Sequence, residues 1–158
     1  RDVAGLDTVL HEGPARYVDS AQLGEEGNVL IFAHSSHLPI VHNQMFRAFN
    51  RVPELVAGDE IVIEGEDGTE YRYRVLVLRQ VDADSPEARI DLSKTGGRKL
   101  TLVTCDTLTG KSARFILEAE FVIGWPAFAQ FLLCFSISGV WGACPFIELG
   151  GSELRQVT

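Results

Sequence analysis

The sequence predicts a mainly β fold, a closed or nearly closed antiparallel β-barrel with short helices. Two observations lead to this fold class. Apolar and β-branched runs of strand length recur along the chain, separated by Gly, Pro, Asn and Asp turn signals. Stretches with a helical period are few and short. With 158 residues, 46% of them hydrophobic, the chain is long enough to bury a core.

The individual elements follow from local composition. The continuous apolar run NVLIFA is typical of a strand buried on both faces, and Asp67-Gly68 is a hairpin signal. A short helix is expected over 44–50, ended before Pro53. Residues 15–27 are polar and predict an irregular turn region. Strands are expected at residues 6–12, 28–33, 59–64, 71–81, 99–105 and 114–123.

Charge and cysteine content exclude several classes of function. The formal net charge of −8 argues against a general phosphate-binding surface, so nucleic acid is not an expected partner. The three cysteines, Cys105, Cys134 and Cys144, are an odd number without CxxC spacing. This disfavours both a disulfide framework and a zinc site. No metal and no other cofactor is expected.

The C-terminal part of the chain is apolar. No charged residue occurs from Phe121 to Ile147, a length that exceeds the ~20 residues needed to cross a bilayer. Prolines, glycines and polar residues dilute this run, and no strong positive flank follows it. Two interpretations therefore stay open for the tail over 124–158. Residues 126–147 form a membrane helix, or an apolar helix packs on the barrel.

The residues with the most chemical potential lie at strand ends. The strand over 99–105 ends on Cys105, and the next strand opens at Arg114. His34 directly ends the apolar run over 28–33. If these strand ends meet in one cleft, the cleft holds a nucleophile, a proton carrier and a cationic group for an oxyanion.

Three separate segments resemble one known family. LTLVTC at 100–105, with Arg114 opening the next strand, resembles the signature of sortases, the cysteine transpeptidases of bacterial cell surfaces. The family pattern TLxTC is matched in full. LHEGPARY at 10–17 and GEEGNVLIFAHS at 24–35 resemble the segment that carries the family's histidine. The pieces agree in order and spacing over about residues 6–123, and they imply an eight-stranded β-barrel.

The resemblance also implies a domain organisation. Residues 1–123 would be a sortase-like catalytic domain, followed by the apolar tail over 124–158. Family members have a further strand or two before the segment that matches residue 6, and these N-terminal strands are expected to be missing here.

The resemblance assigns Cys105 as the nucleophile, His34 as the proton carrier and Arg114 as the oxyanion or substrate clamp. A free thiol with a pKa of ~8.5 reacts as thiolate, so a cationic neighbour is useful. An imidazole with a pKa of ~6.5 can donate and accept protons, and a guanidinium stays charged. Thr104 is either a substrate-binding residue or only satisfies the strand end.

Each assigned residue has rivals. Taken alone, a cysteine that ends a strand is usually an inert core residue, and it is the three-part match that favours catalysis. His37 and His42 lie in the loop after His34 and compete for the histidine role, whereas His11 has no argued role. Lys111 is nearer to the cysteine in sequence than the arginine, but a flexible ammonium is a poorer oxyanion fork.

The resemblance implies a transpeptidase that cleaves a Leu-Pro-x-Thr-Gly-like sorting signal through a thioester. The expected partners are the sorting-signal peptide of a surface protein and an amine of the cell wall or of a pilin lysine. The expected location is the cell membrane, on its extracellular face. Residues 35–46 and 82–98 are candidate walls of an apolar peptide groove. The alternatives are an L,D-transpeptidase, weakened by the absence of a His-Gly-Cys signature near Cys105, and a non-catalytic peptide-binding cell-surface domain.

Overall fold

The computed structural model describes residues 8–36, 39–65, 67–94, 96–105, 113–122, 146–149 and 155–157. The described residues contain one eight-stranded sheet with the order β7-β3-β4-β6-β5-β2-β1-β8. Its strands are β1 (Ala15–Tyr17), β2 (Gly27–Phe32), β3 (Glu60–Glu64), β4 (Glu70–Asp82), β5 (Arg98–Cys105), β6 (Ala113–Phe121), β7 (Phe146–Leu149) and β8 (Arg155–Val157). Three short 3-10 helices accompany it: η1 (Gln44–Arg47), η2 (Val52–Glu54) and η3 (Pro86–Ala88).

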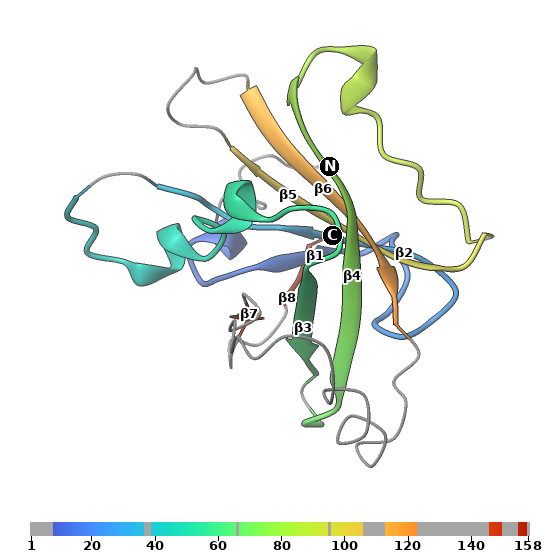
Figure 1. Cartoon of the computed structure of the whole chain (residues 1–158). Helices are drawn as coiled ribbons and strands as arrows, with labels where there is room; N and C mark the ends of the chain where they lie inside the picture. The colour runs from blue at the N-terminus through green and yellow to red at the C-terminus, as the bar shows by residue number, and fades with distance from the viewer. Residues whose placement is uncertain are drawn as a thin grey trace, which may run out of the picture.

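The sheet is strongly twisted, as strands with the usual right-handed twist require. Figure 1 shows the strand direction turning from β1 and β2 to the nearly upright β3 and β4. The pairs β1–β2, β3–β4, β4–β6 and β5–β6 are antiparallel, whereas β2–β5, β1–β8 and β3–β7 are parallel. The pairing is mixed because the β3–β4 hairpin intervenes in the sequence between β2 and β5. The mainly β fold class is confirmed.

One face of the sheet, here called the inner face, carries the main core. Alternating residues of the strands point to it, and the segment after β2 closes over it. Its largest contributions come from β2, β3, β4, β5, β6 and the region of η2. The fully buried members include Val29, Ile31, Phe49, Val52, Ile61, Ile63, Tyr73, Val75, Leu100, Leu102 and Leu117.

The opposite face, here called the outer face, carries a smaller apolar cluster. Leu30, Val81, Val103 and Ile116 are buried there, although they point away from the main core. Their cover comes from the connection between β4 and β5, which contributes Ala88, Ile90 and Leu92. The run NVLIFA is therefore buried on both faces, as its composition predicts.

The N-terminal region differs from its prediction. Residues 8–10 form a helical turn where a strand over 6–12 is expected, and residues 6 and 7 lie outside the described part. Residues 15–17 form β1 within a region expected to be irregular. Pairing with β2 overrides the polar composition here, since Ala15 lies opposite Phe32. The Arg16 guanidinium is buried and donates to the carbonyl of Ser20 at 2.8 Å.

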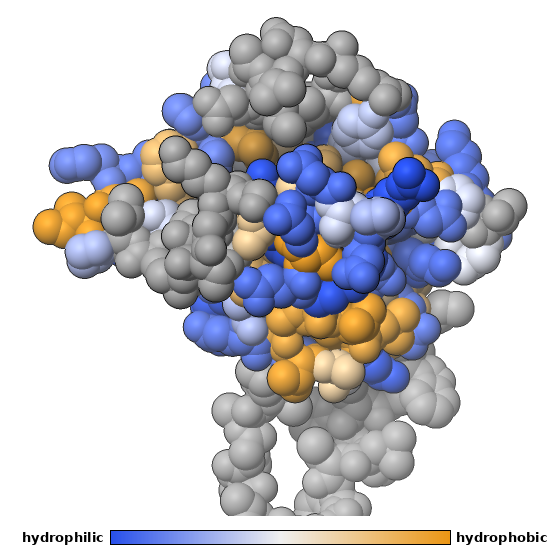
Figure 2. Space-filling view, turned by 90° about the horizontal axis from the view of Figure 1, so that it is seen from above, coloured by the Kyte–Doolittle hydropathy of each residue, from blue (hydrophilic) through white to orange (hydrophobic). Residues whose placement is uncertain are grey.

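The remaining expected elements occur close to their predicted bounds. The helix expected over 44–50 is η1, whose N-terminus is capped by the Asn43 side chain, which accepts from the Met45 N–H at 3.0 Å. The Asp67-Gly68 signal forms the β3–β4 turn, and Gly68 has a φ of 76°, which favours glycine. Figure 2 shows hydrophilic residues over the centre of one face and a hydrophobic area below them.

Most of the apolar tail lies outside the described residues. This holds for residues 126–145 of the predicted membrane helix, and for Cys134 and Cys144. The tail's described pieces, β7 and β8, extend the sheet at its two edges. None of the helices that the structure describes has the length and apolar character that a membrane crossing requires. The division at residue 123 stays a prediction.

Candidate active site

Cys105 and Arg114 lie directly opposite each other. β5 and β6 are antiparallel, and Cys105 and Arg114 form the last pair of their ladder. Opposed residues of an antiparallel pair project to the same face, with Cβ atoms about 4.5–5.5 Å apart. Both side chains are half-buried. The register therefore places both side chains on the outer face, at one end of the sheet, where the Arg114 guanidinium donates to the Ala113 carbonyl at 2.9 Å.

The segment that contains His34 reaches the same end of the sheet. β2 runs parallel to β5, with Phe32 beside Val103, and the Ala33 N–H donates to the Val103 carbonyl at 3.2 Å. Two residues further on, the Ser35 hydroxyl donates to the Cys105 carbonyl at 2.5 Å. His34 lies between these two bonds. The backbones of all three predicted catalytic residues thus converge at the adjoining ends of β2, β5 and β6.

The His34 ring is half-buried in an aromatic environment. The Phe46 ring meets it edge-on, with the ring centroids 5.0 Å apart. The His11 ring is near both, with its centroid 5.9 Å from that of His34 and 5.0 Å from that of Phe46. The His34 carbonyl also accepts from the Phe49 N–H at 3.0 Å. The helix η1 and the turn after it therefore fix the position of the imidazole.

Of the residues that compete with His34 and Arg114, the structure describes only His42. His42 is exposed and precedes η1 in the chain. His37 and Lys111 lie outside the described residues. His11, for which the sequence suggests no role, contacts the ring of His34. Its only sequence signal is its place in the LHEGPARY segment.

Thr104 lies on the inner face, because successive residues of a strand point to opposite faces. It is 2% exposed, and its hydroxyl has no hydrogen-bond partner among the described residues. The structure thus places it behind the thiol, on the side of the main core. Its role in substrate binding stays a prediction.

Ser35 is a site residue that sequence reasoning misses. Its side chain is 5% exposed, and its hydroxyl connects the end of β2 to the backbone of Cys105. Asn50 supports the next residue from the other side: its side chain accepts from the Ser36 N–H and donates to the Ser36 carbonyl, both at 2.7 Å. No group of three or more His, Cys, Asp or Glu in the described ranges is arranged to hold a metal ion.

Comparison with known proteins assigns the family. The model of the sortase domain matches residues 3–122, which is most of the chain. The chain belongs to the sortase family. The family expected from the TLVTC segment, Arg114 and the histidine segment is therefore confirmed. A comparison with curated proteins finds no match.

Solved sortase structures share this fold. The sortase C1 of Streptococcus agalactiae gives a TM-score of 0.61 at 21% identity, over 78% of this chain and 60% of that chain. Sortase A from Corynebacterium diphtheriae gives 0.60 at 20% identity, over 78% and 54%. The Clostridium perfringens sortase D5 transpeptidase gives 0.57 at 21% identity, over 73% and 65%. This sortase chain thus spans less than two thirds of the length of each of these structures.

Proposed function

We propose that this sortase domain is a cysteine transpeptidase with Cys105 as its nucleophile. The observation that carries the proposal is the register of the β5–β6 ladder, which sets Cys105 opposite Arg114. The bond from the Ser35 hydroxyl to the Cys105 carbonyl joins the segment of His34 to the end of β5. A nucleophile, a proton carrier and a cation on adjoining strand ends are the components of acyl transfer.

Each side chain has a distinct task in the proposed reaction. The Cys105 thiolate attacks a peptide carbonyl, and the C–N bond breaks as His34 donates a proton to the leaving amine. The product is a thioester between the N-terminal part of the substrate and the enzyme. Arg114 donates to the oxyanion of the tetrahedral intermediate and favours the thiolate before attack. An incoming amine then loses a proton to His34 as it forms the new amide bond and releases Cys105.

The proposed substrate is a sorting signal of the Leu-Pro-x-Thr-Gly kind on a surface protein. The proposed acceptor is an amine of the cell wall or of a pilin lysine, and the proposed location is the extracellular face of the cell membrane. Among the similar solved structures, that of Streptococcus pneumoniae sortase C gives insight into pilin substrate specificity. With a net charge of −8, this chain gains little from charge in binding an acidic peptide. We therefore propose that apolar contacts along the outer face, and not ionic contacts, bind the peptide.

Mass spectrometry of peptide adducts tests the proposed function. The protein is incubated with a library of sorting-signal peptides, digested, and searched for a thioester. We expect the adduct on the peptide that contains Cys105, and its loss in Cys105→Ala. Cys134→Ala and Cys144→Ala are matched controls that should keep the adduct. A protein that binds these peptides without an adduct would instead be a peptide-binding domain.

The same assay tests the choice of histidine. We expect His34→Ala to abolish most of the acylation, because proton transfer by a positioned side chain contributes roughly 10²–10⁴-fold. His42→Ala is the matched control, since that side chain is exposed. Equal losses in His34→Ala and His37→Ala would contradict the assignment of His34.

A further inference from the structure

The connection between β4 and β5 crosses the outer face of the sheet. β4 and β5 both pair antiparallel with β6, so they run in the same direction. After the end of β4 the chain must therefore return along the length of the strands to the other end of the sheet, where β5 begins (Figure 1). On the way, Ala88, Ile90 and Leu92 pack on the outer-face cluster. The connection, described over residues 83–94 and 96–97, therefore covers this face and is here called the strap.

The strap borders the predicted catalytic residues. Val103 belongs to the cluster under the strap, and Cys105 follows on the same face two residues later, about 6.6 Å along the strand. Phe32 is packed against the same cluster, two residues before His34. A peptide lying across Cys105 therefore has the strap at its side. The position of the strap then decides what such a peptide contacts on that side.

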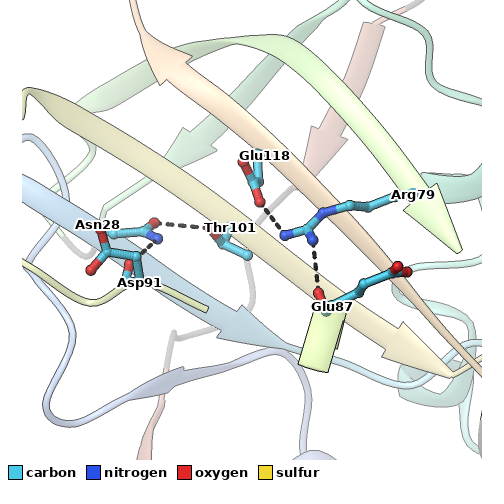
Figure 3. Close-up of polar contacts among 6 residues, drawn as sticks. All are labelled: Asn28, Arg79, Glu87, Asp91, Thr101 and Glu118. Atoms are coloured by element: carbon cyan, nitrogen blue, oxygen red, sulfur yellow. Dashed lines mark hydrogen bonds and ion pairs between the residues drawn. The ribbon is translucent and has the colours of Figure 1, made fainter. Parts of the chain in front are cut away.

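Asn28 and Thr101 hold the strap from below. The Asn28 amide donates to the Asp91 carbonyl in the strap at 2.8 Å, and its side-chain oxygen accepts from the Thr101 hydroxyl at 3.0 Å (Figure 3). A carbonyl only accepts, so the amide nitrogen must face Asp91 and the oxygen must face Thr101. Asn28 is 8% exposed and Thr101 1% exposed. The Thr101 hydroxyl therefore orients the amide that holds the strap.

Arg79 holds the strap at a second point. Its guanidinium forms an ion pair with Glu118 on β6 and donates to the backbone carbonyl of Glu87 in η3 at 2.7 Å (Figure 3). The Arg79 side chain is one third exposed, so this ion pair by itself contributes little to stability. It does fix where η3 lies. The strap is thus attached to β2 through Asn28 and to β4 through Arg79.

Between these attachments the strap is not fully packed. A hollow lies beneath it, lined by Leu76, Ile90, Asp91, Lys99, Thr101 and Glu118 along with Asn28 itself. Contacts across a hollow are weaker than those of a filled interior. The hydrogen bonds of Asn28 therefore have a large share in fixing the strap beside its apolar contacts.

We propose that Asn28, oriented by Thr101, is a positioning residue that sets the Michaelis constant for the peptide. It holds the strap at Asp91, and Thr101 lies four residues, or about 13 Å, along β5 from Cys105, so the bond fixes the course of the strap along the outer face toward the thiol. Arg79 has the same task at the other attachment. The inference rests on the proposed function, because the peptide is the one that Cys105 would attack. It gives a role to Thr101 in TLVTC and to Asn28 in GEEGNVLIFAHS, which the proposed chemistry does not use.

Trypsin cleavage after Arg89 and Lys94 measures strap opening without any substrate, since both side chains are exposed in the strap. Loss of one buried hydrogen bond should raise the cleavage rate about fivefold in Thr101→Val. Asn28→Asp replaces the donor by a charged acceptor facing a carbonyl, so we expect a rise of about tenfold or more. Arg79→Met, at a partly exposed residue, should fold normally and also speed cleavage.

The controls separate the strap from general stability. Thr101→Ser keeps the hydroxyl and should stay within about twofold of the unaltered protein in cleavage. Thr69→Val makes the same change in the β3–β4 turn, where the Thr69 hydroxyl donates to Asp67 at 2.8 Å. This turn precedes β4, at the end of that strand opposite to the point where the strap leaves it. Thr69→Val should leave cleavage after Arg89 unchanged.

Peptide kinetics complete the test. In Thr101→Val and Asn28→Asp we expect KM to rise about five- to tenfold while kcat stays within about twofold, because the strap shapes the groove and does not touch the reacting atoms. A fall in kcat of about five- to tenfold with an unchanged KM would overturn the inference. It would also be overturned if neither the cleavage rate nor KM changed in Thr101→Val, Asn28→Asp and Arg79→Met. If the unaltered protein forms no adduct on Cys105, the proposed function fails. The trypsin result then still decides whether Asn28 and Thr101 hold the strap.

Discussion

Replacing Ser35 by alanine tests how the site is assembled. The Ser35 hydroxyl is 5% exposed and donates to the Cys105 carbonyl at 2.5 Å. The change removes this bond and leaves a carbonyl beside the thiol with one donor fewer. A hydrogen bond of this kind contributes about 1 kcal/mol to the free energy of unfolding. For a domain of this length we therefore expect Tm to fall by about 2–4 °C.

The effect of Ser35→Ala on the reaction should exceed its effect on stability. The bond joins the segment of His34 to the backbone of Cys105, so its loss lets the proton carrier and the nucleophile move relative to each other. A displacement of about 1 Å between reacting groups can cost on the order of 10² in rate. We expect the rate of acyl-enzyme formation to fall on the order of tenfold to a hundredfold, measured by mass spectrometry at fixed times.

Ser20→Ala is a matched control for this prediction. The Ser20 hydroxyl donates to the Tyr17 carbonyl at 2.6 Å, and Ser20 is 7% exposed. Both serines lose a hydroxyl-to-carbonyl bond, and Ser20 also loses a long contact of 3.4 Å from the Arg16 guanidinium. Ser20 lies between β1 and β2, whereas Ser35 follows the end of β2. We expect similar losses in Tm and a lower acylation rate only in Ser35→Ala. If both variants acylate at the same rate, the bond to Cys105 has no part in positioning the site.

Two further predictions concern Arg114 and the pH dependence of stability. Arg114→Ala should lower the acylation rate on the order of 10²–10³ if the guanidinium serves the oxyanion, and a loss below about threefold would make it a structural residue. The hydroxyl and the N–H of Thr69 both donate to Asp67 and lower the pKa of that carboxyl. The stabilisation is thus present above the ordinary aspartate pKa of about 4 and is lost as the pH falls through the lower folded pKa. Asp67→Asn should therefore destabilise the protein in urea unfolding at pH 7 and have little effect at pH about 2; equal effects at both pH values would contradict the linkage.

Several elements could be predicted because their signals are local. The apolar run NVLIFA, the Asp67-Gly68 turn and the TLVTC strand each have their determinants within a few residues of sequence. The predictions from composition were wrong at residues 8–10, where a strand was expected, and at β1, where an irregular region was expected. In β1 a buried arginine is stabilised by the carbonyls of the turn that follows, with no signal in residues 15–17 themselves. Sheet formation depends on the neighbouring strands more than on intrinsic preference, so such short strands escape sequence reasoning.

In the candidate site, too, some residues could be predicted from the sequence and others could not. Cys105, Arg114 and His34 could be named from the sequence because each ends or opens a strand with its own pattern. Ser35 and the Asn28–Thr101 pair could not, because their partners are 70 and 73 residues away. The sequence by itself determined the mainly β architecture and named the candidate reactive groups. Only the tertiary structure decided that β2 lies parallel to β5, which brings the segment of His34 to the strand end that carries Cys105. Strand pairing over such distances depends on the packing of the whole sheet.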